Sequence, residues 1–287
     1  MSDHRKQNEK YHTHISAKHK LFDLKLSELF RYKDLILLFT KRSVTVQYKQ
    51  TVLGPLWLFL NPFLTSLMYM VVFGNIAKLG TEGVPQILFY LTGSAVWGFF
   101  SACLVNNAAT FTGNAPLFGK VYFPRLAIPV SNVLSGAIRF AVQMILVLVF
   151  LGYYVAVGQV SPHWWAWLAI PLVLLQLGLL GMGLGVVISS VTTKYRDLSV
   201  LVGFGVQLWM YATPVVYPLS TVGDGILKTA LLLNPVTPSV ELFRYAILGQ
   251  GTVDIPYLLL SWGVTAVLLC LGIIVFNRVE RTFMDTV

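Results

Sequence analysis

From Leu56 to Phe276 the chain consists of long apolar stretches separated by short polar segments. A helix that crosses the hydrocarbon core of a bilayer needs about 17–25 predominantly apolar residues. No stretch alternates as the strands of a membrane barrel do, and helices pair all their backbone polar groups internally. The pattern therefore predicts an all-α polytopic membrane protein with six transmembrane helices. The predicted spans are Leu56–Ile76, Ile87–Phe111, Leu126–Tyr154, Trp164–Val191, Leu198–Tyr217 and Pro256–Phe276.

Basic residues are distributed unevenly among the segments that separate these spans. The chain has 21 Lys and Arg against 12 Asp and Glu, and 17 of the basic residues fall in the two terminal segments and alternate loops. Lys and Arg favour the cytoplasmic side of a membrane, and an even number of spans places both termini on one side. The distribution predicts cytoplasmic N- and C-termini. Because no clustered basic patch is present, it argues against nucleic acid as a partner.

The segment before the first span divides into two parts. Residues 1–20 are polar, and we expect a disordered tail here, although His12 and His14 have the His-x-His spacing that can bind a metal. The pattern of residues 21–54 predicts an amphipathic helix in the membrane interface, followed by a linker. A helix that packs on a soluble protein has a similar pattern, but the nearby membrane span favours the interface. Its apolar positions are Phe22, Leu26, Leu29, Phe30, Ile36 and Leu37. Residues 55–287 form the predicted six-span domain.

The loop of residues 113–125, between the second and third spans, is superficially similar to a nucleotide-binding P-loop. Five residues rather than four separate Gly113 from Gly119, and Val121 stands where a P-loop has Ser or Thr. The sequence therefore predicts no ATPase site on this chain. The loop is either an ordinary basic cytoplasmic loop or a docking helix for a cytoplasmic partner. The candidate docking residues are Lys120, Tyr122, Phe123, Pro124 and Arg125.

A second inner loop, Lys194–Leu198, is short and charged, and it adds four candidate docking residues: Lys194, Tyr195, Arg196 and Asp197. We expect Asp197 to cap the helix that follows, because aspartate is favoured at that position.

Two short apolar segments, Ile226–Leu233 and Val240–Leu248, follow the fifth span, and neither is long enough to cross a membrane. The sequence Asn-Pro-Val-Thr-Pro between them predicts a turn. Residues 218–249 therefore predict a re-entrant helical hairpin on the outer side, although a loop lying flat on the membrane has the same pattern. Glu241 and Arg244 can form an ion pair within it. The candidate residues here are Pro214, Pro218, Asn234, Pro235, Pro238, Glu241 and Arg244.

Charged residues are almost absent from the predicted spans. Arg139 is the one ionisable Lys, Arg, Asp, Glu or His well inside a span, and it is either a functional group or a snorkelling, structurally paired arginine. The absence of carboxylates from the span interiors argues against an ion-coupled secondary transporter and an intramembrane hydrolase. Cys103 and Cys270 both lie in apolar spans, so we expect neither a disulfide nor a metal site.

Small and aromatic residues mark two further features of the spans. Gly181 and Gly185 have the spacing that allows two helices to approach closely. Aromatic residues gather near the predicted outer ends of spans one, two and five. They form either an interfacial belt or a set of rings that stack on sugars in a wide conduit. The candidate pore-lining aromatics are Tyr69, Phe73, Trp97, Trp209 and Tyr211.

Four motifs in order resemble one family of transport proteins. Tyr48–Trp57 reads YKQTVLGPLW, Lys120–Arg125 reads KVYFPR, Lys194–Leu198 reads KYRDL and Asn234–Arg244 reads NPVTPSVELFR. Together with the six-span outline, they resemble the permease subunit of ATP-binding-cassette polysaccharide exporters, which move O-antigen, capsule and teichoic-acid chains. In that family the segment matching residues 113–125 is a coupling helix on the ATPase, and the segment matching residues 218–249 forms outer gate helices.

The resemblance implies a transport permease with no catalytic residues, rather than an enzyme, that moves a lipid-linked, O-antigen-like polysaccharide across the bacterial inner membrane. The implied partners are a second copy of the chain and two cytoplasmic ATPase subunits, which would bind the ATP and magnesium; no cofactor is expected on this chain. The alternatives are a homo-oligomeric channel, a permease for a drug or small lipid, and a membrane-embedded enzyme of polymer synthesis. The last would require an acidic motif that the sequence lacks.

Overall fold

The computed structural model describes residues 26–49, 51–118, 123–192 and 197–286, and within these ranges all regular secondary structure is helical. The predicted all-α fold is therefore confirmed for the described residues. The elements are α1 (Leu26–Arg31), α2 (Lys33–Tyr48), η1 (Gly54–Leu56), α3 (Trp57–Tyr69), η2 (Met70–Ile76), α4 (Gln86–Ala108), α5 (Thr110–Phe118), α6 (Ala127–Ala156), η3 (Trp164–Ala169), α7 (Ile170–Thr192), α8 (Leu198–Tyr211), η4 (Leu219–Thr221), α9 (Ile226–Leu233), α10 (Thr237–Leu248) and α11 (Ile255–Thr286).

Five helical segments of the described chain are long and apolar enough to cross a membrane, one fewer than the sequence predicts. They are Gly54–Ile76, Gln86–Ala108, Ala127–Ala156, Trp164–Thr192 and Ile255–Val279. The predicted fifth span, Leu198–Tyr217, is the exception, because its helix α8 ends at Tyr211 after 14 residues. At 1.5 Å per residue α8 is roughly 21 Å long, shorter than a hydrocarbon core of about 30 Å. The six-span topology is therefore not confirmed.

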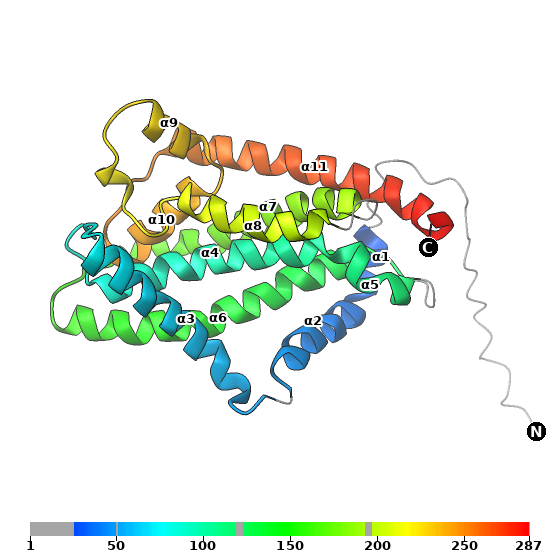
Figure 1. The fold of residues 1–287 in the computed structure, drawn as a ribbon, viewed down its shortest axis with the longest axis horizontal. Coiled ribbons are helices and arrows are strands. Elements are labelled where there is room, and N and C mark those ends of the chain that lie inside the picture. The colour runs from blue at the N-terminus through cyan, green and yellow to red at the C-terminus, as the bar shows by residue number, and fades with distance from the viewer. Residues whose placement is uncertain (1–25, 50, 119–122, 193–196, 287) are drawn as a thin grey trace, which may run out of the picture.

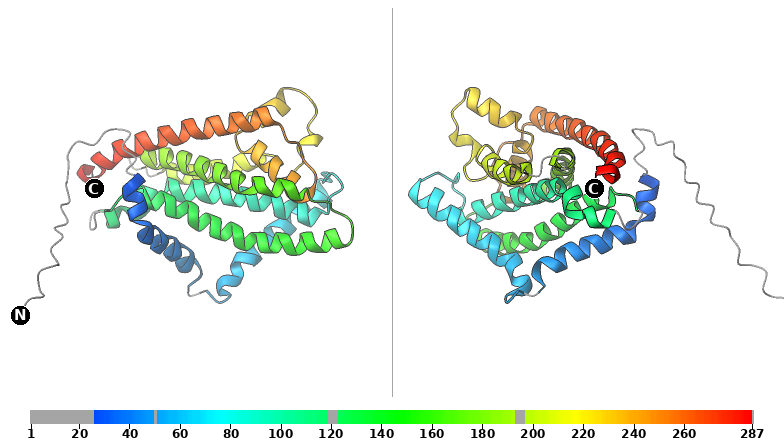
Figure 2. Two further views of the ribbon diagram at one scale, coloured as in Figure 1. Left: turned by 180° about the vertical axis from the view of Figure 1, so that it is seen from behind. Right: turned by 45° about the vertical axis from the view of Figure 1, so that its right-hand side comes forward.

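Helix α4 lies at the centre of the bundle (Figure 1). It packs against α7 along much of its length, against α6 on a second side and against α3, α8 and α10. Helix α11 packs on the opposite side of α7. Two further views show that α5 and the C-terminal end of α11 lie at one end of the molecule, whereas α9 and α10 lie at the other (Figure 2). The molecule thus has one end built around the predicted coupling segment and one built around the predicted hairpin.

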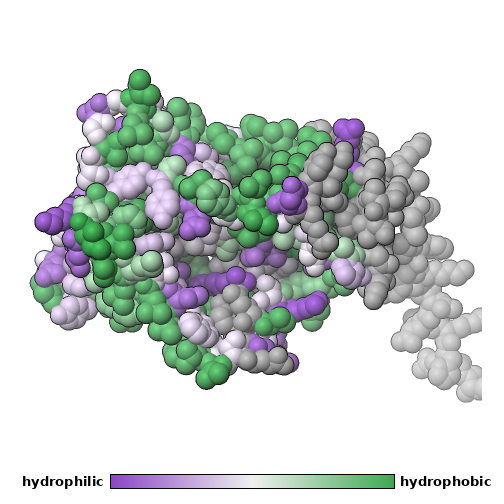
Figure 3. Space-filling view, viewed as in Figure 1, coloured by the Kyte–Doolittle hydropathy of each residue, from purple (hydrophilic) through white to green (hydrophobic). Residues whose placement is uncertain are grey.

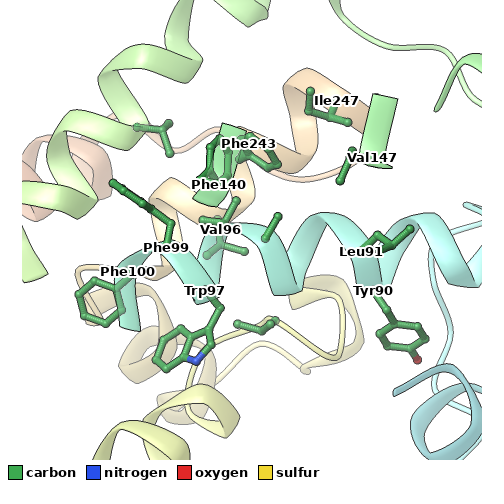
Figure 4. Packing of buried hydrophobic residues seen from close by; sticks show 14 of the residues in the cluster. Tyr90, Leu91, Val96, Trp97, Phe99, Phe100, Phe140, Val147, Phe243 and Ile247 are labelled. Carbon is green, nitrogen blue, oxygen red and sulfur yellow. The ribbon is translucent and has the colours of Figure 1, made fainter. Parts of the chain in front are cut away.

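The core gathers around α4 because this helix is apolar on all sides and therefore needs partners all around it. In its most apolar window 78% of the residues are buried, against 6% for the segment that contains α3. Figure 4 shows Phe140 of α6 and Phe243 of α10 on one side of α4, and Trp97 on another. The rings of Phe140 and Phe243 meet edge to face at 6.0 Å, which links α6 to α10.

Glycine allows α7 to lie close to both of its neighbours. A Cβ atom at Gly185 would lie 2.6 Å from the backbone oxygen of Leu104 on α4, and one at Gly181 would lie 2.8 Å from the Cβ of Cys103. On the opposite face, a Cβ at Gly183 would lie 2.9 Å from the backbone of α11. The close helix approach predicted for Gly181 and Gly185 is confirmed.

The N-terminal segment contains two helices, α1 and α2, in place of the single amphipathic helix that the sequence predicts. Helix α2 packs against α6 and buries Ile36 and Thr40, while Leu37 and Leu38 remain exposed. Leu37, which follows the buried Ile36, therefore points away from the protein. A place in the membrane interface stays a prediction, and the predicted tail of residues 1–20 lies outside the described residues.

Candidate functional site

The predicted outer hairpin consists of α9, a turn at residues 234–236 and α10. Asn234 forms the turn: its side-chain oxygen accepts a hydrogen bond from the backbone N–H of Val236 at 3.1 Å. Its amide donates to the backbone oxygen of Ala212 at 3.0 Å and to Oγ1 of Thr213 at 2.8 Å. The same side chain therefore shapes the hairpin and ties it to the chain that follows α8. Helix α9 has the predicted bounds, but α10 begins at Thr237, so the turn is shorter than the predicted Asn234–Pro238; insertion of the hairpin into the membrane stays a prediction.

Arg244 is the largest fully buried side chain in the described structure. Its guanidinium donates to the backbone oxygens of Pro214 at 2.5 Å and Val215 at 2.6 Å. It also lies 3.4 Å from a carboxylate oxygen of Glu241, as the spacing predicts, and 4.0 Å above the ring of Phe89. Backbone carbonyls, a carboxylate and a ring face are each favourable partners for a guanidinium. Arg244 therefore joins α10, the segment after α8, and α4 at one point.

Glu241 connects the same point to the loop that precedes α11. It is 3% exposed, and its second carboxylate oxygen accepts a hydrogen bond from the backbone N–H of Thr252 at 3.2 Å. A buried carboxylate is costly unless it is paired and hydrogen-bonded, and here it is both. Pro214 and Pro218 are also buried, and Pro238 lies in the first turn of α10, where proline is favoured.

An exposed pair at the start of α9 contrasts with this buried pair. Lys228 donates to the Asp224 carboxylate at 2.7 Å, and this hydrogen bond lowers the pKa of the Asp224 carboxyl below its ordinary value. Both side chains contact solvent, so the pair contributes little to stability. Of these two pairs, the buried Glu241–Arg244 pair is therefore the one that stabilises the hairpin.

Gln176 of α7 is a polar residue at the centre of the bundle that the sequence analysis overlooked. Its amide nitrogen donates to Ser261 at 2.8 Å and Thr265 at 2.9 Å, both on α11, and its oxygen accepts from Ser239 of α10 at 2.7 Å. Ser261 in turn donates to the backbone oxygen of Pro235 at 2.5 Å. The signal in the sequence is a single amide within an apolar span, because a buried amide requires partners.

The five candidate aromatics, called here the aromatic cluster, form two groups of neighbouring rings on α3, η2, α4 and α8. Tyr69 and Phe73 have ring centroids 5.9 Å apart, and Phe73 lies 6.4 Å from Tyr211. Trp97 lies 6.4 Å from Trp209. Within this chain the candidate rings therefore pack against other rings, in one group of three and one pair. Whether they line a transport path stays a prediction.

The aromatic cluster offers a test that separates sugar stacking from packing. Trp209 is partly exposed between Trp97 and Phe100, so its replacement by Leu keeps an apolar, though smaller, side chain and removes the ring face. If the ring stacks on sugars, we expect Trp209→Leu to lower the surface polymer several-fold at unchanged protein level, measured by immunoblot of the polymer. The matched control is Trp164→Leu, because Trp164 is exposed and lies outside the cluster. Normal export in both variants would contradict stacking.

The predicted coupling segment is only partly described. Its first part is helix α5, and residues 119–122, which include Lys120 and Tyr122, lie outside the described residues. Phe123 is buried, with its ring 5.9 Å from Phe118 and 5.6 Å from Phe39. Arg125 lies 5.3 Å above the ring of Phe118. Phe123 therefore anchors the segment to the bundle beside α2, and the neighbouring residues remain the candidates for contact with a partner.

The second candidate coupling loop also lies largely outside the described residues, which omit residues 193–196. Asp197 directly precedes α8, but its side chain makes no capping hydrogen bond. The predicted capping role is therefore wrong: Asp197 already has helical backbone angles, whereas a capping residue is usually extended.

The hairpin and the segment after α8 lie within the part of the chain that matches the model of a known protein family. The model described as ABC-2 type transporter matches residues 34–248. The chain belongs to the ABC-2 type transporter family. Membership in this family confirms the class of transport permease that the four sequence motifs indicate.

Curated permeases and export proteins of several bacteria resemble the chain over almost its whole length. The O-antigen export system permease protein RfbA of Myxococcus xanthus is 30% identical over 261 residues, 91% of this chain and 98% of its own length. RfbA of Klebsiella pneumoniae is 27% identical over 252 residues, 88% of this chain and 94% of its own. The capsule polysaccharide export inner-membrane protein CtrC of Neisseria meningitidis is 24% identical over 275 residues, 89% of this chain and 95% of its own.

Proposed function

We propose that the chain is the transmembrane subunit of an ATP-driven exporter that moves a lipid-linked, O-antigen-like polysaccharide across the bacterial inner membrane. The observation that carries the proposal is the near full-length similarity to permeases named for O-antigen and capsule polysaccharide export. The same observation favours polysaccharide over a drug or small lipid as cargo, and the family favours a transporter over a channel.

The proposed assembly contains two copies of the chain and two separate ATPase subunits. Exposed apolar residues on α3 and α8, two helices that lie in front of α4 in Figure 1, support a second copy. Met68 on α3 and Phe204 on α8 are each more than 60% exposed. Lipid or another copy must cover such faces. The ATPase subunits would dock at the end of the molecule that carries α5, which the charge distribution assigns to the cytoplasm.

Docking of the ATPase is tested by a double substitution in the coupling segment. We expect Tyr122→Ala with Arg125→Glu to reduce the ATPase that co-purifies with the permease at least tenfold and to abolish surface polymer. The reason is that an aromatic contact is removed and a basic one is reversed in charge. Co-purification from membranes and an immunoblot of the polymer measure the two effects.

The matched control is Lys228→Glu, which reverses an exposed charge at the opposite end of the molecule and should leave co-purification unchanged. Normal ATPase binding and export in the double variant would refute docking at this segment. Export that persists in a strain without the ATPase would favour the channel.

A further inference from the structure

Arg139 lies deep within α6 and is poorly satisfied by its own chain. It is the thirteenth residue of the helix, roughly 18 Å from the first by the rise per residue. Its one contact with a hydrogen-bonding group in the described structure is a 3.5 Å approach of Nη2 to Oγ of Ser43 on α2. Its Nε is buried and has no acceptor among the described residues. The guanidinium thus has several unused donors.

Such an arginine is expensive inside an apolar helix bundle. A guanidinium carries five N–H donors and keeps its charge, and a buried donor without an acceptor costs about 1–3 kcal/mol. Among the described residues, no carboxylate lies within ion-pair distance of it, in contrast to Lys228 with Asp224 and Arg244 with Glu241. Arg244 has a carboxylate and two backbone carbonyls as close partners, whereas no described group of opposite charge faces Arg139.

Arg139 borders a cavity between α3, α4 and α6. The cavity has a volume of about 200 Å³, several times the roughly 30 Å³ that one water occupies in the liquid. Asn61 of α3 and Gln143 of α6 add amide groups to its wall, and Pro62 and Phe99 add apolar surface. Figure 3 shows hydrophilic surface within a hollow beside the apolar surface in this part of the molecule. The site therefore combines a cation, polar hydrogen-bonding groups and apolar walls.

We propose that this cavity binds the phosphate group of a membrane lipid. A guanidinium matches the geometry of a phosphate, which offers several acceptor oxygens and a negative charge. The amides of Asn61 and Gln143 supply further donors, and the apolar walls suit the adjoining hydrocarbon chain. The cavity opens beside α3, and only 6% of the most apolar window of that segment is fully buried within this chain, so a lipid alongside the helix can reach the cavity.

Two lipids offer this chemistry: a bulk anionic phospholipid and a phosphate-linked carrier of the polysaccharide. The second identification rests on the proposed export function, whereas the lipid-phosphate site itself does not. Binding in purified protein therefore tests the site, and the lipid recovered from cells tests the source.

The experiment uses the purified full-length chain in detergent, with hexadecyl phosphate as the probe and hexadecanol as the matched neutral probe. Native mass spectrometry counts the bound molecules. We expect one hexadecyl phosphate per chain, little hexadecanol, and at least a tenfold lower occupancy in Arg139→Gln. Arg42→Gln is the control, since it removes an exposed arginine next to Ser43 on the same helix α2.

A second variant keeps the arginine and fills the cavity. Gly98 lines the cavity, and the nearest atom to a Cβ placed there is Oε1 of Gln143 at 4.0 Å. Gly98→Val should therefore fold and should reduce phosphate-lipid binding as Arg139→Gln does. Wild-type occupancy in this variant, or equal binding of hexadecanol and hexadecyl phosphate to the native chain, would overturn the proposal, even if Arg139→Gln fails to fold.

The source follows from the lipids that co-purify from cells with and without polysaccharide synthesis. A bulk phospholipid that depends on Arg139 in both strains supports the site and refutes the carrier as its occupant. A carrier lipid found only in the producing strain, and lost in Arg139→Gln, supports both. Failure to export with intact lipid binding in the native chain would count against the proposed function alone.

Discussion

Arg244→Met is expected to lower the free energy of unfolding by about 3–5 kcal/mol, the cost of leaving one member of a buried ion pair without its partner. The substitution removes the hydrogen bonds to Pro214 and Val215 and leaves Glu241 without its cation. Because Arg244 holds the segment after α8 against α10, we also expect the outer end of the molecule to become accessible to proteases. Thermal unfolding in detergent and limited proteolysis measure the two effects.

The control is Lys228→Gln, which breaks the exposed pair with Asp224 and should leave the unfolding transition nearly unchanged. The double variant Glu241→Gln with Arg244→Met should recover part of the loss, since it no longer buries an unpaired carboxylate. Wild-type stability of Arg244→Met would mean that the buried contacts do not hold this region together.

Gly185→Val is expected to destabilise the bundle by about 3 kcal/mol, at the upper end for overpacked positions. A Cβ at this position would lie 2.6 Å from both the Cβ of Asn107 and the backbone oxygen of Leu104, so α4 and α7 must separate. Since these two helices pack against each other along much of their length, the loss should appear as reduced yield of folded protein and an earlier unfolding transition.

Gly205→Ala provides the matched control, because no atom lies within 4 Å of a Cβ at Gly205 on α8. An alanine there should be neutral or stabilising by about 0.5–1 kcal/mol, as expected for a helix interior. Equal behaviour of the two variants would show that α4 and α7 can separate without cost.

The sequence predicts helix positions well where apolar length alone determines them. The five long spans and the turn at Asn234 follow from hydropathy and from asparagine and proline, which act locally. Helix α8 was predicted too long, because an apolar run continues to Tyr217 after the helix has ended at Tyr211. Hydropathy records which residues are apolar and does not record where the backbone stops being helical.

The side-chain contacts were harder to predict, because they depend on how each helix is rotated about its axis. The pair Glu241–Arg244 was predictable from local spacing, but the carbonyl partners of Arg244 come from residues about 30 positions away. Gln176 was missed for the same reason: its partners lie on α10 and α11. Its amide was visible in the sequence, but its partners were not.

Helices α3 and α4 differ in how much of their surface the rest of the chain covers. The position of α4 is therefore set by contacts within the chain, whereas that of α3 depends also on the molecules beside it. Helix α4 is enclosed by its own chain, whereas in the segment containing α3 only 6% of the most apolar window is buried. That segment ends in the π-helical stretch η2, a geometry that is rarely extended and is frequent at functional sites. Amide hydrogen exchange in α3 should therefore report on what lies beside it, and exchange in α4 on the stability of the whole bundle.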